Sequence, residues 1–354
     1  MIFSTSRRVL FLLLFVLSSR CFAGWNKEAQ FRFWLGLDDN VFESLSHTEQ
    51  DKTGRLALVT SCQGRKSNWL LGMQYIGAFE GYSSHSSENR MIHSADLNYS
   101  RLISSHTVFN LQLNGRIKDF FQEERGYRHG DVSPGITIAF TPKYKLSFNY
   151  SYAVFDYQYA TYFDYAFHKA VMRTMLKLSP NWHWNIDAMI GQYHYDRDSY
   201  ELGQTDTQNS LVFVPIYEKQ KDDFYELRTE VEGYSWALFK MAVGYWKRKS
   251  NNYGYSSTCP FFECTLGKTV AKSITLSIRT VLQWLKYDDN LAPLLLVRPD
   301  SESEECSAMV MEISKQLPKN QAVRFRFGLY ENESPFRNRF YQKRILSLGY
   351  TCRF

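Results

Sequence analysis

Histidines, serines and paired carboxylates are the side chains of this 354-residue sequence that could perform hydrolysis. The segment His85-Ser86-Ser87-Glu88 puts a base, two hydroxyls and a carboxylate next to one another, and these residue types can activate a nucleophile. Asp222-Asp223 is a carboxylate pair that could act as general acid and base. Both segments also have the composition of hydrated loops, so hydrolysis is kept only as an alternative prediction.

Metal binding is the second kind of chemistry that the sequence could support. The eight histidines do not have the spacing of a metal site, and we expect no metal and no other cofactor. Asp38-Asp39-Asn40 and Asp288-Asp289-Asn290 carry oxygen atoms that suit Ca²⁺. A solvated loop mouth explains the same composition, and we favour that interpretation.

The first 23 residues have the pattern of a cleaved signal peptide. Arg7 and Arg8 precede an apolar run from Val9 to Leu17, and Ala23 offers a small residue for cleavage. The formal charge of +6 falls to +3 when Arg7, Arg8 and Arg20 are removed, so the mature chain has no charge pattern of a nucleic-acid-binding protein. Residues 24–354 are therefore expected to form one exported domain.

Five cysteines follow the predicted cleavage site, in a compartment where disulfides form. Cys259 and Cys264 flank Pro260-Phe-Phe-Glu and could close a small disulfide loop. Cys62, Cys306 and Cys352 lie in strand-like segments and are expected to be small buried or outward-facing side chains.

The remainder of the sequence indicates long strands that alternate between apolar and polar residues. Aromatic residues make up 16% of the chain, which excludes a disordered protein, and a mean hydropathy of −0.39 excludes a bundle of membrane helices. Residues 108–118, 144–154, 225–232 and 322–329 follow a period of two, and none matches the spacing of a helix.

The connections between these strands alternate between short and long. Short turns are expected at 64–67, 104–105, 142, 180, 234–235, 271–272 and 317–319. Long loops are expected near 40–53, 83–89, 121–131, 157–164, 196–222, 249–259, 287–303 and 331–339. This pattern predicts an all-β fold, a transmembrane antiparallel β-barrel with about 16 strands (14 if the weak strand 261–269 fails) and periplasmic termini. The loop at 196–222 is expected to fold inward.

The last strand resembles the assembly signal of Gram-negative outer-membrane barrels. Its residues are Ser347, Gly349, Cys352 and the terminal Phe354. The resemblance implies the outer membrane as the location, the barrel assembly machinery and membrane lipids as partners, and closure of the last strand against the first. A terminal edge strand of a soluble sandwich is the alternative, but a barrel leaves no edge exposed. The segments 36–42 and 331–354 are also similar to exopolysaccharide-export barrels and related outer-membrane proteins.

The polar face of each strand would then line a lumen. The residues expected there are Arg116, Lys118, Lys169, Arg173, Lys177, Arg228, Arg279, Arg324, Arg326 and Lys343 against Asp187, Glu226, Glu230, Glu232 and Glu312. The basic excess favours anionic solutes. An equally good interpretation is a structural ladder of cross-strand ion pairs around Glu226–Glu232.

These features together predict a monomeric outer-membrane channel that is not an enzyme. Its solute would be small, an acidic sugar, or an exported polysaccharide. A structural or adhesive barrel that acts through its loops is the first alternative, and a hydrolase with its site at the barrel rim is the second.

Overall fold

The structure is a computed structural model that describes residues 25–42, 48–122, 126–158, 161–204, 211–288, 307–332 and 341–354. Within these ranges the regular structure is strand, apart from two short 3₁₀ turns, η1 (Ser86–Glu88) and η2 (Thr161–Phe163). The same ranges contain no helix of the length and apolar character needed to cross a membrane. The predicted signal peptide at 1–23 lies outside the described residues.

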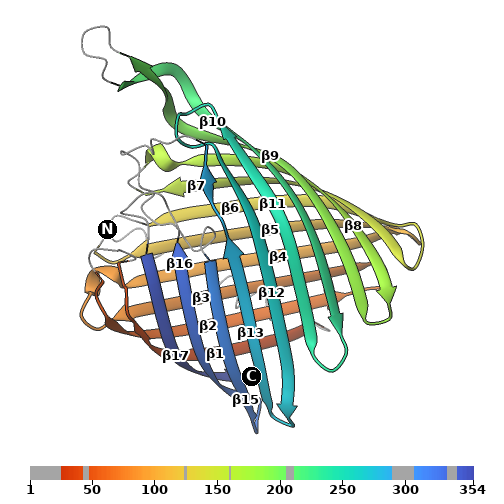
Figure 1. Cartoon of the computed structure of the whole chain (residues 1–354). Helices are drawn as coiled ribbons and strands as arrows, with labels where there is room; N and C mark the ends of the chain where they lie inside the picture. The colour runs from red at the N-terminus through yellow and green to blue at the C-terminus, as the bar shows by residue number, and fades with distance from the viewer. Residues whose placement is uncertain are drawn as a thin grey trace.

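The strands follow one another as antiparallel neighbours (Figure 1). Their bounds are β1 (Asn26–Asp38), β2 (Asp51–Arg65), β3 (Trp69–Tyr82), β4 (Arg90–Ser104), β5 (Thr107–Phe120), β6 (Tyr127–Ala139), β7 (Tyr144–Tyr157), β8 (Tyr165–Ser179), β9 (Trp182–Gln204), β10 (Leu211–Tyr234), β11 (Leu238–Ser250), β12 (Ser257–Ala271), β13 (Ile274–Gln283), β14 (Lys286–Tyr287), β15 (Ser307–Leu317), β16 (Gln321–Asn332) and β17 (Tyr341–Arg353).

The sheet closes on itself, because β1 pairs with both β2 and β17. The seam with β17 runs from Gln30 opposite Arg353 to Asp38 opposite Ile345. The two-residue strand β14 pairs with β12, as β13 does, so both occupy one position in the wall. Among the described residues the seventeen strands therefore form a closed 16-stranded antiparallel barrel, and the prediction of about 16 strands is confirmed.

The seven predicted short turns are confirmed as well, whereas the long loops predicted at 287–303 and 331–339 lie mostly outside the described residues. Short turns join β2 to β3, β4 to β5, β6 to β7, β8 to β9, β10 to β11, β12 to β13 and β15 to β16. The weak strand predicted at 261–269, on which the count of 16 strands depended, is part of β12. Several loops are shorter than predicted, because β2 begins at Asp51, β6 at Tyr127 and β12 at Ser257.

The prediction that 196–222 folds inward as a loop is wrong. Most of this segment continues β9 and β10, which stay paired from Trp182 opposite Gly233 up to Gln204 opposite Leu211. Figure 1 shows this hairpin projecting beyond the other strands. The pairing breaks register between Pro215 and Lys221, where Tyr217 adopts a φ of 56° and is 93% exposed. Backbone pairing stabilises the extension, since each strand supplies the other's hydrogen-bond partners.

The predicted disulfide between Cys259 and Cys264 is wrong too. Both thiols are free, and both residues lie on the single strand β12. Five residues along a strand span about 17 Å, whereas a disulfide joins Cα atoms roughly 4.4–6.8 Å apart. The odd spacing also sends the two side chains to opposite faces.

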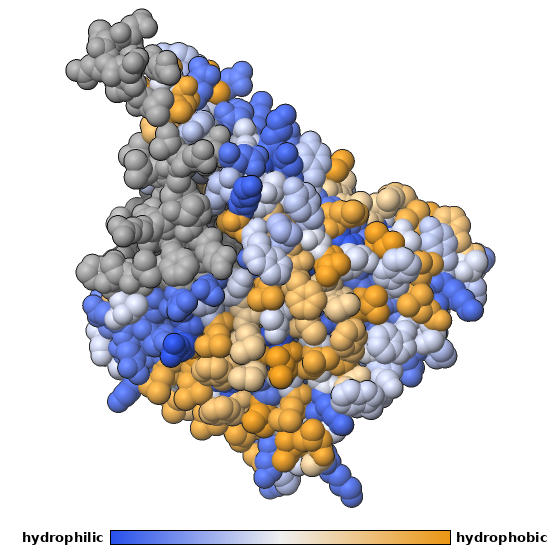
Figure 2. Space-filling view, in the orientation of Figure 1, coloured by the Kyte–Doolittle hydropathy of each residue, from blue (hydrophilic) through white to orange (hydrophobic). Residues whose placement is uncertain are grey.

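The alternation of β7 shows which face of the barrel is which. Phe148 and Tyr150 are each 47% exposed and point outward, whereas Ser147 and Ser151 are each 5% exposed and point inward. The outer face of other strands is likewise apolar, as with Leu227 and Ile190, each 60% exposed. Figure 2 shows a hydrophobic band over the wall with hydrophilic residues toward both ends. An apolar patch of this size suits contact with lipid.

We predict that arginine is costly on the outer face of β7 and tolerated on its inner face. Phe148→Arg should lower the free energy of unfolding by about 2–4 kcal/mol, because its cation would lie in hydrocarbon. Asn149→Arg, one residue further along the strand, should cost little because its side chain points into the lumen. Urea titration in lipid vesicles measures both values. Equal losses for the two variants would show that the faces are assigned wrongly.

Candidate functional site

The candidate site is the inner wall of the barrel. Residues opposite each other on paired strands share a face, so the inner face can be followed from Ser147 around the sheet. Ser147 is opposite Arg173, which is opposite Asp187, which is opposite Arg228. The register places all the predicted lumen residues on this face: Arg116, Lys118, Lys169, Arg173, Lys177, Asp187, Glu226, Arg228, Glu230, Glu232, Arg279, Glu312, Arg324, Arg326 and Lys343.

Ion pairs cross the inner face of β8 and β9. Arg173 donates from Nε and Nη2 to the two carboxylate oxygens of Asp187 at 2.6 and 2.7 Å. Such a two-point contact is the strongest form of an arginine–carboxylate pair. Asp187 is 7% exposed, so its negative charge is directed to Arg173 and not to the lumen solvent.

The pairs continue across β10, β11 and β12. Arg228 donates to Glu230 at 2.7 Å and to Glu263 at 3.1 Å. It reaches Glu263 across β11, whose residues at this level are the small Ala242 and Gly244. Lys240 lies 3.2 Å from Glu230. We call the group Arg173, Asp187, Arg228, Glu230, Lys240 and Glu263 the charge ladder, and it matches the structural alternative that the sequence left open.

Four arginines lie close together on β16, β17, β1 and β2, and we call them the arginine patch: Arg32, Arg55, Arg324 and Arg353. Arg32 interacts electrostatically with the other three. Its guanidinium donates to the neutral amide oxygen of Gln30 at 2.7 and 3.0 Å, and Arg55 lies over the indole of Trp34 at 5.9 Å.

The carboxylates beside the arginine patch make no close contact with its four guanidinium groups. Glu80 is opposite Arg55 and interacts with it electrostatically, but its hydrogen bond at 3.2 Å goes to Arg90. Arg324 lies 3.9 Å from Glu312, and Arg353 lies 3.6 Å from Glu28. Small inner-face residues next to Arg32, namely Ala57 and Thr351, leave room for several arginines on one stretch of wall. This part of the wall therefore has a positive charge that its neighbours balance less closely than those of the charge ladder.

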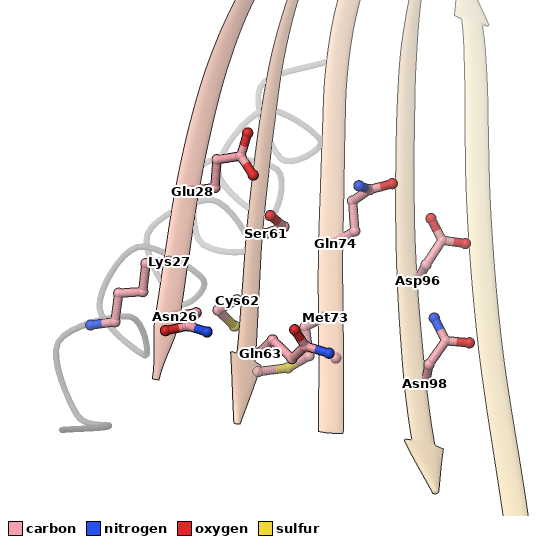
Figure 3. Close-up of a pocket in the computed structure, with 11 residues that line it drawn as sticks. Asn26, Lys27, Glu28, Ser61, Cys62, Gln63, Met73, Gln74, Asp96 and Asn98 are labelled. Carbon is pink, nitrogen blue, oxygen red and sulfur yellow. The ribbon is translucent and has the colours of Figure 1, made fainter. Parts of the chain in front are cut away.

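Amides and carboxylates line the end of the barrel near the short turns. A cavity of about 550 Å³ lies against β1 to β4. Figure 3 shows Glu28, Ser61, Gln74, Asp96 and Asn98 on these four neighbouring strands. On the adjoining wall, hydroxyls and amides bond one another, as when Ser100 donates to Asn110 at 2.9 Å. This surface can hydrogen-bond water or polar solutes.

The Asp38-Asp39-Asn40 motif joins the first strand to the last. Asp38 lies 3.0 Å from the ammonium of Lys343, and Asn40 donates to the carbonyl of Gln342 at 2.9 Å. Asp39 accepts from the backbone N–H of Arg344 at 2.5 Å. These contacts agree with a structural role and not with a calcium site. In the second motif Asp289 and Asn290 lie outside the described residues.

The predicted assembly signal forms the other half of this seam. Ser347 is opposite Gly36, Gly349 is opposite Trp34, and Cys352 is opposite Phe31. A Cβ atom at Gly349 would collide with the indole of Trp34, so glycine is needed there for the close approach. Phe354 exchanges backbone hydrogen bonds with Ala29 at 2.8 and 3.3 Å. Recognition by the assembly machinery stays a prediction.

The two groups considered for hydrolysis are not arranged as a catalytic site. Asp222 is fully buried and accepts from Ser250 at 2.6 Å, whereas Asp223 points to the other face and accepts from Gln192. They are consecutive residues of β10, so their carboxylates point to opposite faces and do not meet as a general acid and base. The favoured expectation of a hydrated cluster beside a loop is wrong for Asp222, which lies buried within the strand. In the part of the chain that is described, no cluster of three or more His, Cys, Asp or Glu could hold a metal ion.

His85 takes part in a cluster at the long-loop end. Its Nδ1 lies 2.9 Å from Asp51 and its Nε2 lies 2.6 Å from Glu49. The nearby Ser83 donates to Asp51 at 2.6 Å and not to the imidazole. The hydrogen bonds to Glu49 and Asp51 raise the pKa of His85. This geometry lacks the contact between nucleophile and base that hydrolysis needs, and it joins the β1–β2 and β3–β4 loops.

Sequence reasoning missed several inner-wall residues. Arg32 and Arg55 were not included, because the strands 26–38 and 51–65 were located only by their loops. Lys240 and Glu263 were missed on β11 and β12, where the polar face also holds Gly and Ala. The signal was the alternation of Phe31, Phe33, Leu35 and Leu37 on β1, which places Arg32 on the opposite, inner face.

Comparison with known proteins shows similarity in fold. No protein-family model matches the chain, and no curated protein matches its sequence. The crystal structure of OccAB3 from Acinetobacter baumannii aligns with a TM-score of 0.50 and 10% identity over 94% of this chain and 100% of OccAB3. A BenF-like porin from Pseudomonas fluorescens Pf-5 aligns with a TM-score of 0.50 and 7% identity over 94% of this chain and 99% of the porin.

These alignments confirm the prediction of an outer-membrane type of β-barrel at the level of fold. The narrower resemblance to exopolysaccharide-export barrels stays a prediction.

We predict that the His85 cluster orders its loops more strongly at acidic pH. An unfolded imidazole has a pKa of about 6.5, and the folded pKa is higher. The stabilisation is therefore complete below about pH 6.5 and is lost as the pH rises through the folded value. Hydrogen exchange of the Ser84 and His85 amides, which donate to Asp51, should be slower at pH 6 than at pH 9 after correction for intrinsic rates.

His85→Gln is the matched control for this prediction, because glutamine keeps a hydrogen-bonding side chain without a titrating group. Its corrected exchange rates should not depend on pH. Equal protection at both pH values in the unmodified protein would contradict the prediction.

Proposed function

We propose that this protein is an outer-membrane channel of the porin type that conducts small solutes and prefers anions. The arginine patch is the observation that carries the proposal, because it leaves positive charge on the inner wall, whereas the acids and bases of the charge ladder are paired with one another. Water in a lumen of this kind would admit solutes, and a positive wall raises the local concentration of anions.

The closed barrel supports a channel by its size. Small barrels of about eight strands fill their interior with side chains, whereas barrels of 16 strands enclose an aqueous channel. The inner wall here carries the charge ladder, the arginine patch and hydroxyl and amide groups such as those of Ser100 and Asn110, and the outer wall is apolar. The BenF-like protein, which shares the fold, is itself named a porin, and this agrees with the proposal.

The location and partners form part of the same proposal. The apolar outer band suits the lipid of a Gram-negative outer membrane, reached through the signal peptide at 1–23 and inserted by the barrel assembly machinery. We infer a monomer. An acidic sugar or an exported polysaccharide segment is the finer choice of solute, since both carry the negative charge that the wall would attract.

A surface barrel that acts through its loops is the second candidate. The β9–β10 hairpin favours it, because the paired ends of β9 and β10 extend past the other strands and expose Val212, Val214 and Tyr217. A barrel of this type would bind a partner outside the membrane and conduct little current. Conductance therefore separates the two candidates.

We predict an anion-selective current in planar bilayers. With a tenfold KCl gradient, the reversal potential should show more permeation by Cl⁻ than by K⁺. Replacing Arg32, Arg55 and Arg324 together by Gln should reduce the ratio of Cl⁻ to K⁺ permeability by about threefold or more, because three cations leave the wall.

Arg101→Gln is the control, since Arg101 lies on the exposed outer face of β4 and the lumen keeps its charges. This variant should keep the original reversal potential. A pore that does not conduct, or one in which the triple variant keeps its selectivity, would overturn the proposed function.

A further inference from the structure

A continuous row of aromatic rings crosses the inner wall of six adjacent strands, and we call it the aromatic belt. Its members, one from each strand from β6 to β11, are Tyr127, Phe155, Tyr165, Tyr193, Phe224 and Trp246. Centroids of successive rings lie 4.6, 5.3, 5.4, 6.2 and 5.8 Å apart. Strands lie about 4.8 Å apart, so the belt extends over roughly 24 Å of the wall.

These rings lie on the inner face of the barrel wall, where the register of β6 to β11 places them. The apolar residues of the outer face contact lipid, but a ring on the inner face borders the aqueous lumen. Tyr127 and Phe224 are buried, at 1% and 8% exposed. The other four rings, Phe155, Tyr165, Tyr193 and Trp246, keep part of their surface exposed. The belt therefore presents ring surface to the lumen.

Cations are fixed on the belt by contact with its rings. The guanidinium of Arg248 lies 5.3 Å from the ring centroid of Tyr193 and 5.7 Å from that of Trp246. Tyr193 stacks on Phe167 at 3.9 Å, and Lys169 lies 5.8 Å from the Phe167 ring. At the other end Lys118 lies 5.7 Å from Tyr127. Positive charge thus accompanies the rings from β5 to β11.

Two carboxylates of β10 lie on the inner face beside the belt. Asp222 is buried and accepts from Ser250 and Gln220, and Glu226 lies near Trp246. Glu226 is directly opposite Trp246 on the neighbouring strand, and it interacts with Arg228 and Lys169. Lys169 offsets part of its charge, whereas Arg228 already pairs with Glu230 and Glu263, so Arg248 is the cation that a carboxylate beside Trp246 would meet.

We infer that the aromatic belt is a binding site for carboxylates that carry a ring. A planar ring, or the C–H face of a pyranose, can pack against the partly exposed rings of Tyr193 and Trp246, while the carboxylate of the same ligand pairs with the guanidinium of Arg248. An acidic sugar and an aromatic acid share this chemistry. The inference rests on the proposed channel function, because a solute reaches the belt through the lumen.

The test is isothermal titration of the full-length protein, refolded in detergent, with four probes. An oligogalacturonate is the acidic sugar, benzoate the aromatic acid, a neutral glucose oligomer the ring without charge, and acetate the charge without a ring. The proposal expects binding of the oligogalacturonate, of benzoate or of both, with the neutral sugar and acetate at least about tenfold weaker. Binding of the oligogalacturonate alone would identify an acidic sugar as the ligand, and binding of benzoate alone would identify an aromatic acid.

Two variants localise the site. Trp246→Leu and Arg248→Gln should each raise the dissociation constant by about three- to tenfold, because each removes one of the two proposed contacts. Tyr245→Leu is the matched control: this ring is the neighbour of Trp246 on the outer face and is 46% exposed, and its loss should leave binding unchanged. Trp246→Phe keeps a ring and should retain most of the affinity even if the leucine variant folds poorly.

The binding test of the aromatic belt and the conductance test of the channel can fail independently of each other. If the protein conducts a current but binds neither oligogalacturonate nor benzoate, the aromatic belt is not a binding site, and the proposed channel function is unaffected. Binding that Arg248→Gln and a folded Trp246→Leu both leave unchanged, or equal binding of the neutral sugar, would also overturn it. Binding without a current would support the belt and refute the channel.

Discussion

Backbone hydrogen bonding between β1 and β17 is the contact on which the rest of the structure depends. Without it the sheet would have two long edges with unpaired N–H and C=O groups, which lipid cannot satisfy. The seam is reinforced at the long-loop end, where Asp38 pairs with Lys343 and Asn40 bonds the carbonyl of Gln342. At the other end Phe354 bonds Ala29. Closure holds sixteen strands in one register, and that register decides which side chains share the lumen.

Once the barrel is closed, the period of two separates two environments. Outward residues such as Phe148 lie in an apolar band, and inward residues such as Ser147 and Asn149 bond one another. A slip of one residue at any strand would exchange the two sets. Polar side chains facing outward and rings facing inward are then departures from the pattern, and the aromatic belt is the largest such departure among the described strands.

The inner wall is divided into regions with different physical roles. In the charge ladder acids and bases are paired at 2.6–3.2 Å and hold neighbouring strands together. The arginine patch has longer contacts to carboxylates and supplies net positive charge. The aromatic belt adds ring surface toward the long-loop end. A solute that carries both a ring and a negative charge would meet complementary surface on two sides of the lumen.

The amino-acid pattern was sufficient for the fold, because each strand alternates locally and each turn or loop carries its own composition. Segments such as 144–154 identify both faces of a strand without any knowledge of its neighbours, and the alternation of turns and loops gives the number of strands. The face of each charged residue followed from the same period, which is why Arg173, Glu230 and Arg324 were predicted to face inward.

Tertiary structure decided the relations between strands. Whether Glu230 faces the solute or pairs with Arg228 and Lys240 depends on register across β10 and β11, which no single strand encodes. The convergence of Arg32 with Arg324 requires the closed seam between residues almost 300 positions apart. The belt is hidden in the sequence for the same reason, because Tyr193 and Trp246 are ordinary strand aromatics until the barrel brings them to one wall.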